Sequence, residues 1–243
     1  MELTLTSIHK SFGNTEVLKD ISFSVKEGEF VSILGPSGSG KSTLFSIVGG
    51  LLQPNKGEVL LNEKAITGKS GYISYMPQQP SLFPWRTLLD NVVLGQELHG
   101  NKDVKMAREL LEIAGLGEFS DAYPHQLSGG MKQRAAFIRA MLSPQKIMCL
   151  DEPFSALDAF TRLDMQKWLL KTWQNTGQSI LFITHDMDEA IFLSDKIVIL
   201  TQGPAEINDI IEVPFNRPRD ESLLLSYPFL ELKRTLANTV KKH

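Results

Sequence analysis

Apolar runs alternate with helical segments along the second half of the chain. Three runs are rich in apolar residues, Lys146–Leu150, Ser179–Thr184 and Lys196–Leu200, and helical spacing separates them at Phe160–Gln174 and Met187–Leu193. Strands that are apolar on both faces are typical of a parallel sheet covered by helices on each side. The pattern therefore predicts an α/β core with a mainly parallel sheet.

The first third of the chain is mostly strand-like. Polar and apolar residues alternate over 2–8, and short strands are expected at Ile21–Val25, Phe30–Leu34 and Glu58–Asn62. A helix is expected at Lys41–Val48, where apolar residues recur at helical spacing and two glycines follow.

Residues from about 85 to 140 have helical rather than strand-like spacing, as in the segment Asp103–Gly115. This stretch is expected to be a helical insert in the α/β core. After Gly203 the chain carries prolines at 204, 214, 218 and 228, and we expect only a short last helix near Leu230–Asn238. This tail is too short for a regulatory domain.

Composition narrows the class of protein. The 243 residues carry 25 Lys and Arg against 28 Asp and Glu, a net charge of −3, and the isoelectric point near 6.0 argues against a nucleic-acid partner. The apolar runs are far shorter than the roughly 20 residues of a membrane helix, and the N-terminus lacks a secretory signal. The single cysteine, Cys149, excludes an internal disulfide framework. We therefore expect a soluble, intracellular chain.

A glycine-rich segment joins the expected strand Phe30–Leu34 to the helix at Lys41 and matches the phosphate-binding pattern G-x-x-x-x-G-K-[ST]. In such loops backbone N–H groups surround the β-phosphate, the lysine reaches the β- and γ-phosphates, and the Ser or Thr hydroxyl binds Mg²⁺. This setting favours a nucleoside triphosphate site over a simple glycine turn. The residues expected to bind the nucleotide are Gly35, Pro36, Ser37, Gly38, Ser39, Gly40, Lys41, Ser42 and Thr43.

Two carboxylates, Asp151 and Glu152, follow the apolar run that ends at Leu150. Paired acids at the end of a strand can simply be solvated. Beside a phosphate loop, however, Asp151 is expected to hold Mg²⁺ and Glu152 to polarise the attacking water. Cys149, inside the strand, is interpreted as a small buried hydrophobe rather than a nucleophile.

The segment Leu127-Ser128-Gly129-Gly130 opens a helical stretch that runs to about Leu142. Alone, Ser128 could be only the N-cap of that helix. Between a phosphate loop and an acidic strand, the segment resembles the signature of the ATP-binding cassette (ABC) ATPases, and the resemblance extends from about residue 2 to 235. The family's other motifs match in order at Phe12, Gln78, Ser155-Ala156-Leu157-Asp158 and His185.

The resemblance implies a single ABC ATPase domain over 1–243. Its P-loop NTPase core, with a mainly parallel sheet and an antiparallel β subdomain, would occupy about 1–84 and 145–205. A helical subdomain would occupy about 85–144, and a short C-terminal tail about 206–243.

The resemblance also implies roles for single residues. Phe12 would stack on adenine, Gln78 would contact Mg²⁺ and the attacking water, and His185 would touch the γ-phosphate. Ser128, Gly129 and Gly130 would bind ATP held by the other subunit of a head-to-tail homodimer, and Asp158 would cross that interface. The implied catalytic residues are Lys41, Gln78, Glu152 and His185, and the implied Mg²⁺ ligands are Ser42, Gln78 and Asp151.

Some local alternatives stay open. His185 could cap the helix that begins near Asp186, and Phe12 could be a core residue. The sequence departs from many family members at Phe12, where tyrosine is common, and at Met131, where glutamine is common. Pro77, directly before Gln78, is a further departure that stiffens the loop.

Two segments resemble importers in particular. Leu82–Val92 is similar to the loop of importer ATPases that contacts a permease, with Trp85 and Arg86 as the expected anchors, although Trp85 could also be core. In the tail, Ile211–Pro214, Arg217–Asp220 and Phe229–Leu232 resemble the nitrate, sulfonate, taurine and thiamine-precursor importers.

The resemblance therefore implies an importer ATPase that uses ATP and Mg²⁺ at the cytoplasmic face of the membrane. Its partners would be a second copy, integral-membrane permease subunits and, indirectly, an extracytoplasmic solute-binding protein. The alternatives are an ABC export or lipoprotein-release subunit and a soluble P-loop kinase. The signature segment and His185 argue against the kinase.

Overall fold

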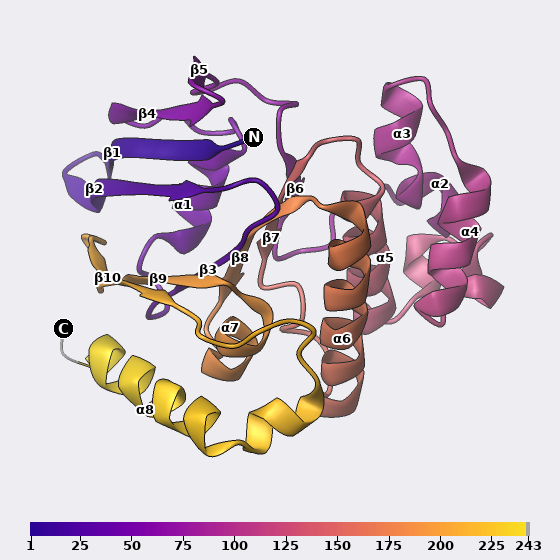
Figure 1. The fold of residues 1–243 in the computed structure, drawn as a ribbon. Helices are drawn as coiled ribbons and strands as arrows, with labels where there is room; N and C mark the ends of the chain where they lie inside the picture. Colours follow the sequence, from indigo (N-terminus) through magenta and orange to yellow (C-terminus); the bar gives the residue numbers. More distant parts are fainter. Residues whose placement is uncertain (242–243) are drawn as a thin grey trace.

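The computed structural model describes residues 1–241, which form two sheets and the helices around them (Figure 1). The larger sheet has the order β10-β9-β3-β8-β7-β6, and its strands are parallel except for the antiparallel edge pair β10–β9. Its strands are β3 Phe30–Leu34, β6 Ser74–Met76, β7 Ile147–Asp151, β8 Ser179–Thr184, β9 Lys196–Leu200 and β10 Ile207–Glu212. The smaller sheet is antiparallel, in the order β2-β1-β4-β5, with β1 Leu3–Phe12, β2 Thr15–Val25, β4 Lys56–Leu61 and β5 Lys64–Ala65.

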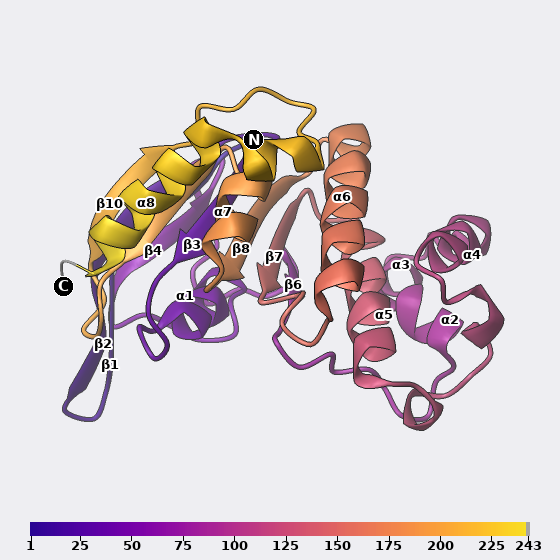
Figure 2. The ribbon, with the colours of Figure 1, turned by 90° about the horizontal axis from the view of Figure 1, so that it is seen from below.

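The helices lie on both faces of the larger sheet. In Figure 2, α7 and α8 cover one face, while α2, α3 and α4 project to the side beyond α5 and α6. The α-helices are α1 Lys41–Val48, α2 Leu88–Val92, α3 Leu94–Leu98, α4 Val104–Ile113, α5 Gly129–Met141, α6 Ala159–Thr176, α7 Met187–Leu193 and α8 Tyr227–Lys241. Short 3₁₀ turns occur at Gly117–Phe119, Pro124–Gln126 and Glu221–Leu225. None of the helices in this part of the chain has both the length and the apolar character that a membrane span requires.

The strands of the larger sheet are apolar on both faces because they separate two cores. In β8, Ile180 and Phe182 face the core made with α5, α6, α7 and α8. Leu181 and Ile183 face the opposite core, made with α1 and the antiparallel sheet. All four side chains are fully buried. Because successive strand residues point to opposite sides, a continuous apolar run was needed, and the expected α/β class is confirmed.

A third core lies within the helical segment. It is formed by apolar residues of α2, α4 and α5, including Leu88, Leu111 and Ile138. Helix α5 contributes to this core from one side and, through Phe137, to the core of the larger sheet from the other. Helix α5 therefore connects the helical segment to the sheet. The finer division into subdomains proposed from the sequence stays a prediction.

The expected elements are present, but several are longer or additional. The first strands form one long hairpin, Leu3–Phe12 with Thr15–Val25, rather than two short pieces. The tail contains a strand, β10, that pairs with β9, and its helix begins at Tyr227 instead of near Leu230. The sequence predicted only a short last helix in this tail, and the strand was missed because its stability depends on the open edge of β9.

The tail is held by a buried arginine at the end of α7. Arg219 Nη1 donates to the carbonyl oxygens of Ile191 at 2.9 Å, Phe192 at 3.1 Å and Ser194 at 2.7 Å. The last carbonyl groups of a helix lack partners within the helix, and a positive charge there is favourable. Burial, with the nearby positive charge of Arg217, lowers the pKa of Arg219 to about 10, so the side chain stays protonated at neutral pH.

Three further contacts fix the tail against the rest of the chain. The Arg217 guanidinium lies 4.2 Å from the centre of the Trp173 ring, and its Nε donates to Asp195 Oδ1 at 2.8 Å. On α8, Lys233 Nζ lies 2.7 Å from Asp188 Oδ1 of α7. The tail segment that resembled importers therefore holds α7 in place.

Candidate functional site

A cavity of about 520 Å³ lies where β3 ends and α1 begins. It combines most of the glycine-rich loop with side chains from three distant parts of the chain. Its lining consists of Val17, Ser37, Gly38, Gly40, Lys41, Ser42, Thr43, Gln78, Glu152 and His185. The fold thus brings the expected phosphate loop together with three of the expected catalytic side chains.

The loop backbone is shaped by Gly40. Its φ angle is 89°, in the left-handed region, and a Cβ atom there would lie 2.8 Å from Val17 Cγ1 and 2.9 Å from Leu18 Cδ2. Only glycine fits both conditions. No side chain caps α1, so the first N–H groups of this helix are available to a ligand in the cavity.

Lys41 is folded back onto its own loop. Its Nζ donates to the carbonyl oxygens of Gly35 at 2.9 Å and Pro36 at 2.7 Å. Burial lowers the pKa of Lys41, and the negative charges of Glu152 and Asp151 oppose that shift. A phosphate oxygen is a stronger, charged acceptor than a carbonyl group, so a bound nucleotide can take over these hydrogen bonds.

Asp151 ends β7 with a side chain that is only 3% exposed. Burial raises its pKa, while a hydrogen bond from Ser42 and the charge of Lys41 act in the opposite direction. Within residues 1–241 no three His, Cys, Asp or Glu side chains cluster to form a metal site by themselves. The carboxylate, hydroxyl and amide oxygens of Asp151, Ser42 and Gln78 fit Mg²⁺ that arrives with nucleotide phosphates, which supply the remaining oxygen ligands.

Glu152 has a strained backbone and a doubly contacted carboxylate. Its φ angle is 46°, and its N–H donates to the Ile183 carbonyl at 3.1 Å while its own carbonyl accepts from the Ser155 N–H at 3.2 Å. Oε2 accepts a hydrogen bond from Gln78 Nε2 at 3.0 Å, and Oε1 lies 3.2 Å from His185 Nδ1. Left-handed backbone at a non-glycine residue persists where surrounding contacts enforce it, commonly at functional sites.

His185 does not cap the helix that follows it. Asp186 does so, accepting from the N–H groups of Asp188 at 2.7 Å and Glu189 at 3.3 Å. The side chain of His185 is 61% exposed and faces the cavity. The alternative of His185 as a helix cap is therefore wrong.

Besides Gly35, Pro36 and Ser39 of the loop itself, five of the expected nucleotide-binding residues do not line this cavity. Phe12, at the end of β1, is half exposed, which excludes a core role, and Lys10 Nζ lies 5.1 Å from its ring centre. Ser128 caps α5 by accepting from the Met131 N–H at 3.2 Å. The signature residues open an exposed helix N-terminus, and Asp158 caps another, that of α6. The five residues are Phe12, Ser128, Gly129, Gly130 and Asp158.

Two residues that the sequence analysis did not single out organise the loop after Gln78. The buried Asn91 side chain accepts from the Phe83 N–H at 2.7 Å and donates to the Arg86 carbonyl at 3.1 Å. Arg139 donates to the carbonyl oxygens of Pro80 and Ser81, both at 2.9 Å. In the sequence, Asn91 could have been noticed only as a polar residue within the mostly apolar segment Leu88–Val93. No sequence feature pointed to Arg139.

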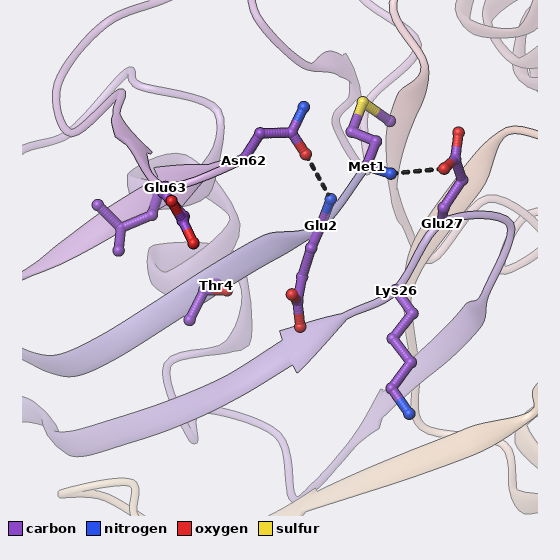
Figure 3. Close-up of a pocket in the computed structure, with 8 residues that line it drawn as sticks. Met1, Glu2, Thr4, Lys26, Glu27, Asn62 and Glu63 are labelled. Atoms are coloured by element: carbon purple, nitrogen blue, oxygen red, sulfur yellow. Dashed lines mark hydrogen bonds and ion pairs between the residues drawn. The ribbon is translucent and has the colours of Figure 1, made fainter.

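A second hollow, of about 510 Å³, lies beside the start of the chain (Figure 3). There the Met1 amino group is 2.6 Å from Glu27 Oε2, and the Glu2 N–H donates to Asn62 Oδ1 at 2.8 Å. These pairs satisfy the polar groups of the N-terminus within the chain. The hollow contains no helix N-terminus or glycine-rich loop, and we assign it no ligand.

Comparisons with known proteins agree on one family. The sequence profile described as "ABC transporter" matches residues 18–155. An uncharacterized ABC transporter ATP-binding protein of Methanocaldococcus jannaschii is 43% identical over 241 residues, which cover 98% of this chain and 89% of the relative. An aliphatic sulfonates import ATP-binding protein of Bacillus thuringiensis subsp. konkukian is 40% identical over 226 residues, 91% of this chain and 90% of the relative.

A longer relative and a solved structure agree with the same family. A nitrate import ATP-binding protein of Synechococcus elongatus is 38% identical over 252 residues, 99% of this chain but only 38% of that longer protein. A solved ATP-binding cassette, a dimer in a post-hydrolysis state bound to ADP and Pi, superposes with a TM-score of 0.78. It is 32% identical in sequence, and the match covers 88% of this chain and all of the solved chain.

Proposed function

This chain belongs to the ABC transporter family and is an ATPase, and we propose that it powers the import of a small solute through a separate permease. One observation carries the proposal: a single cavity contains the phosphate loop together with Gln78, Glu152 and His185. These are the groups needed to hold a triphosphate and to activate a water molecule beside it.

In the proposed mechanism the loop and Lys41 hold the β- and γ-phosphates. Ser42, Asp151 and Gln78 would hold Mg²⁺, which neutralises phosphate charge when bound. Glu152 would then accept a proton from the attacking water. Its geometry suits that task, because Gln78 and His185 contact one carboxylate oxygen each and so hold the side chain in one orientation.

Two further roles concern the nucleotide base and the second subunit. Phe12 is an exposed aromatic ring, suited to stack on adenine. The exposed N-terminus of α5, at Ser128, Gly129 and Gly130, would bind the γ-phosphate of ATP held by a second copy, since it does not line the cavity of its own chain. The dimeric state of the similar solved cassette supports this homodimer.

The permease would contact the surface between Gln78 and Asn91. Trp85 is 70% exposed, which excludes a core role, and its ring centre lies 5.1 Å from that of Phe83. A hollow of about 450 Å³ beside them is lined by residues of this loop and of the helical segment, including Leu82 and His125. Large aromatic side chains are frequent anchors in protein interfaces.

Arg86, the second expected anchor, is already engaged within the chain. Its guanidinium pairs with both carboxylate oxygens of Glu97, at 2.9 and 3.0 Å, and donates to the Asp90 carbonyl at 3.1 Å. We therefore assign Arg86 a supporting role and Trp85 the contact itself. The subunit would sit on the cytoplasmic face of the membrane, with a solute-binding protein on the opposite side.

For the solute we propose the class carried by the named relatives, nitrate or aliphatic sulfonates, or a related taurine-like or thiamine-precursor compound. The tail segments Ile211–Pro214 and Arg217–Asp220 support the same group.

The proposal has a direct test in two steps. The purified chain with MgATP should release phosphate without any acceptor, whereas phosphate transfer to a metabolite would indicate a kinase. Co-expression with its permease, followed by reconstitution in vesicles, should give ATP-dependent movement of solute toward the side that carries this subunit. Movement in the opposite direction would identify an exporter instead.

A further inference from the structure

A buried carboxylate that does not line the cavity lies behind His185. Glu189, on α7, is 6% exposed. Its Oε2 accepts a hydrogen bond from Thr184 Oγ1 at 2.5 Å, and its Oε1 accepts one from Gln166 Nε2 at 3.2 Å. Burying a carboxylate is costly unless it is fully hydrogen-bonded. A buried carboxylate this close to the expected catalytic histidine therefore indicates a role in the site.

Thr184 connects this carboxylate to the backbone on both sides of His185. The Thr184 hydroxyl donates its proton to Glu189 and accepts the Asp186 N–H at 2.9 Å. One side chain thus ties the residue before His185 to the residue after it. Because the Thr184 hydroxyl points its hydrogen at Glu189, a lone pair of its oxygen is directed toward the Asp186 N–H and accepts that hydrogen bond.

The His185 ring has little other support. It is largely exposed, and Glu152 Oε1 lies 3.2 Å from its Nδ1. Its position relative to Glu152 therefore depends on the backbone that Thr184 and Glu189 hold. The Glu189 network and the catalytic carboxylate also border one small void of about 30 Å³, between His185, Thr184, Glu189 and Glu152.

The guanidinium of Arg162, on α6, lies near the charge of Glu189. Arg162 Nε lies 3.9 Å from Glu189 Oε1, and Arg162 Nη1 lies 3.8 Å from Asp186 Oδ2. Burial and the negative charge of Asp186 raise the pKa of Glu189, while the Thr184 hydrogen bond and Arg162 lower it. The network is a hydrogen-bonded unit at the junction of β8 and α7, separate from the nucleotide-binding loop.

We propose that Glu189 is a positioning residue for ATP hydrolysis, acting through Thr184 to hold His185 beside Glu152. The inference rests on the role proposed above for His185. A purely structural role is the alternative: Glu189 would then stabilise the junction of β8 and α7 without affecting the reaction. The two differ in whether the effect of Glu189 on turnover passes through His185.

A double-mutant cycle with His185 separates them. The purified protein is assayed for MgATP-dependent phosphate release and for its melting temperature, with wild type, Glu189→Ala, Glu189→Gln, His185→Ala and the double variant His185→Ala/Glu189→Ala. We expect Glu189→Ala to lower kcat by roughly 10- to 100-fold, the scale of a misplaced catalytic group, with KM for ATP changed less than about twofold. Glu189→Gln keeps an oxygen for the Thr184 hydroxyl and should retain most activity.

In the His185→Ala background, Glu189→Ala should cause no further loss of kcat, although it lowers the melting temperature as much as in wild type. Thr184→Val removes the connecting hydroxyl and should reproduce the loss of kcat even if Glu189→Ala fails to fold. Arg219→Ala is the matched control: it destabilises the other end of α7, and kcat at 25 °C should change less than about twofold.

Equal fractional losses of kcat in the wild-type and His185→Ala backgrounds would overturn the proposal and leave Glu189 a structural residue. Wild-type turnover in Glu189→Ala or Thr184→Val, with His185→Ala impaired, would overturn this inference alone. Wild-type turnover in His185→Ala would remove the proposed role of His185 and this inference with it.

Discussion

His185 Nδ1 lies 3.2 Å from Glu152 Oε1, at the carboxyl ends of two adjacent parallel strands. Asp151 of β7 is in register with Ile183 of β8, so Glu152 and His185 leave the sheet side by side. The Glu152 N–H also donates to the Ile183 carbonyl at 3.1 Å, which joins the two strand ends directly. Strand pairing thus brings Glu152 and His185 to the same edge of the sheet, where the contacts around each side chain hold the carboxylate beside the imidazole.

Lys41→Ala should lower ATP hydrolysis by at least about 100-fold, the scale seen when one electrostatic contact to the transition state is lost. The lysine is the charged side chain of the phosphate loop, and its Nζ is held beside the Gly35 and Pro36 carbonyls. The measurement is phosphate release together with nucleotide binding by equilibrium dialysis. Near-wild-type turnover in a folded variant would contradict the assignment of the loop.

Glu152→Gln should trap an ATP-bound homodimer. The substitution removes the proposed base, which should cost about 10²–10⁴-fold in rate, while an oxygen remains to accept from Gln78 Nε2. Light scattering after size exclusion, with and without MgATP, should show a dimer only for Glu152→Gln with MgATP.

Adding Ser128→Arg to Glu152→Gln blocks the exposed N-terminus of α5 and should keep the protein monomeric. An inactive but monomeric Glu152→Gln protein at saturating MgATP would contradict dimerisation by the isolated subunit. Wild-type turnover in this variant would show that another residue activates the water.

Trp85→Ala should weaken binding to the permease by roughly 30-fold, about 2 kcal/mol for an interface anchor, without changing hydrolysis by the isolated subunit. The reason is that the indole is largely exposed and makes no contact with the nucleotide cavity. Co-purification with the permease is the measurement. Phe119→Ala, a surface aromatic outside the loop, is the control, and unchanged assembly in Trp85→Ala would place the interface elsewhere.

Asp158 should have two separable roles, as the cap of α6 and as a residue of the dimer interface. Asp158→Asn keeps one N-cap acceptor and should lower the melting temperature at pH 7 less than Asp158→Ala does, while reducing the MgATP-dependent dimer in the Glu152→Gln background. Asp158→Ala should reduce both. Asp103→Ala removes the cap of α4 and should reduce stability alone.

The capping role of Asp158 also has a pH signature. A hydrogen bond from the Thr161 hydroxyl, at 2.6 Å, and the Thr161 N–H hold the pKa of Asp158 below 3.8. The stabilisation is therefore fully present above that value and is lost as pH falls through the lowered pKa. The stability difference between wild type and Asp158→Ala should shrink in acid, and a difference independent of pH would contradict this assignment.

Arg219→Ala should destabilise the protein by about 2–3 kcal/mol because it leaves carbonyl oxygens of Ile191, Phe192 and Ser194 without partners. For a chain of this size the melting temperature should fall by roughly 4–12 °C. Arg219→Lys keeps the charge with fewer donors and should recover part of the loss. A thermal melt identical to wild type would show that water replaces the guanidinium at the end of α7.

Much of the site could be predicted because the sequence patterns that mark it are formed by residues close together in the chain. The phosphate loop follows from the spacing of Gly35, Gly40 and Lys41, since glycine conformations and the N-terminus of a helix act within a few residues. The α/β class follows from apolar runs of strand length separated by helical spacing, which reflect burial on both faces of a parallel sheet. Ser128 as a helix cap is equally local.

Relationships between distant residues were decided only by the tertiary structure. Gln78 and Glu152 are 74 positions apart and meet because β6 and β7 are neighbours in the sheet. The left-handed backbone of Glu152, the Glu189–Thr184 bond behind His185 and the clamping of α7 by Arg219 leave no periodic trace in the sequence. The strand β10 likewise exists because β9 offers an unpaired edge. Local patterns determined the elements and the phosphate loop, whereas strand order and register determined which side chains face one another. The reason is that hydrogen bonds between strands connect distant parts of the chain, and the number of residues between those parts carries no information about their distance in space.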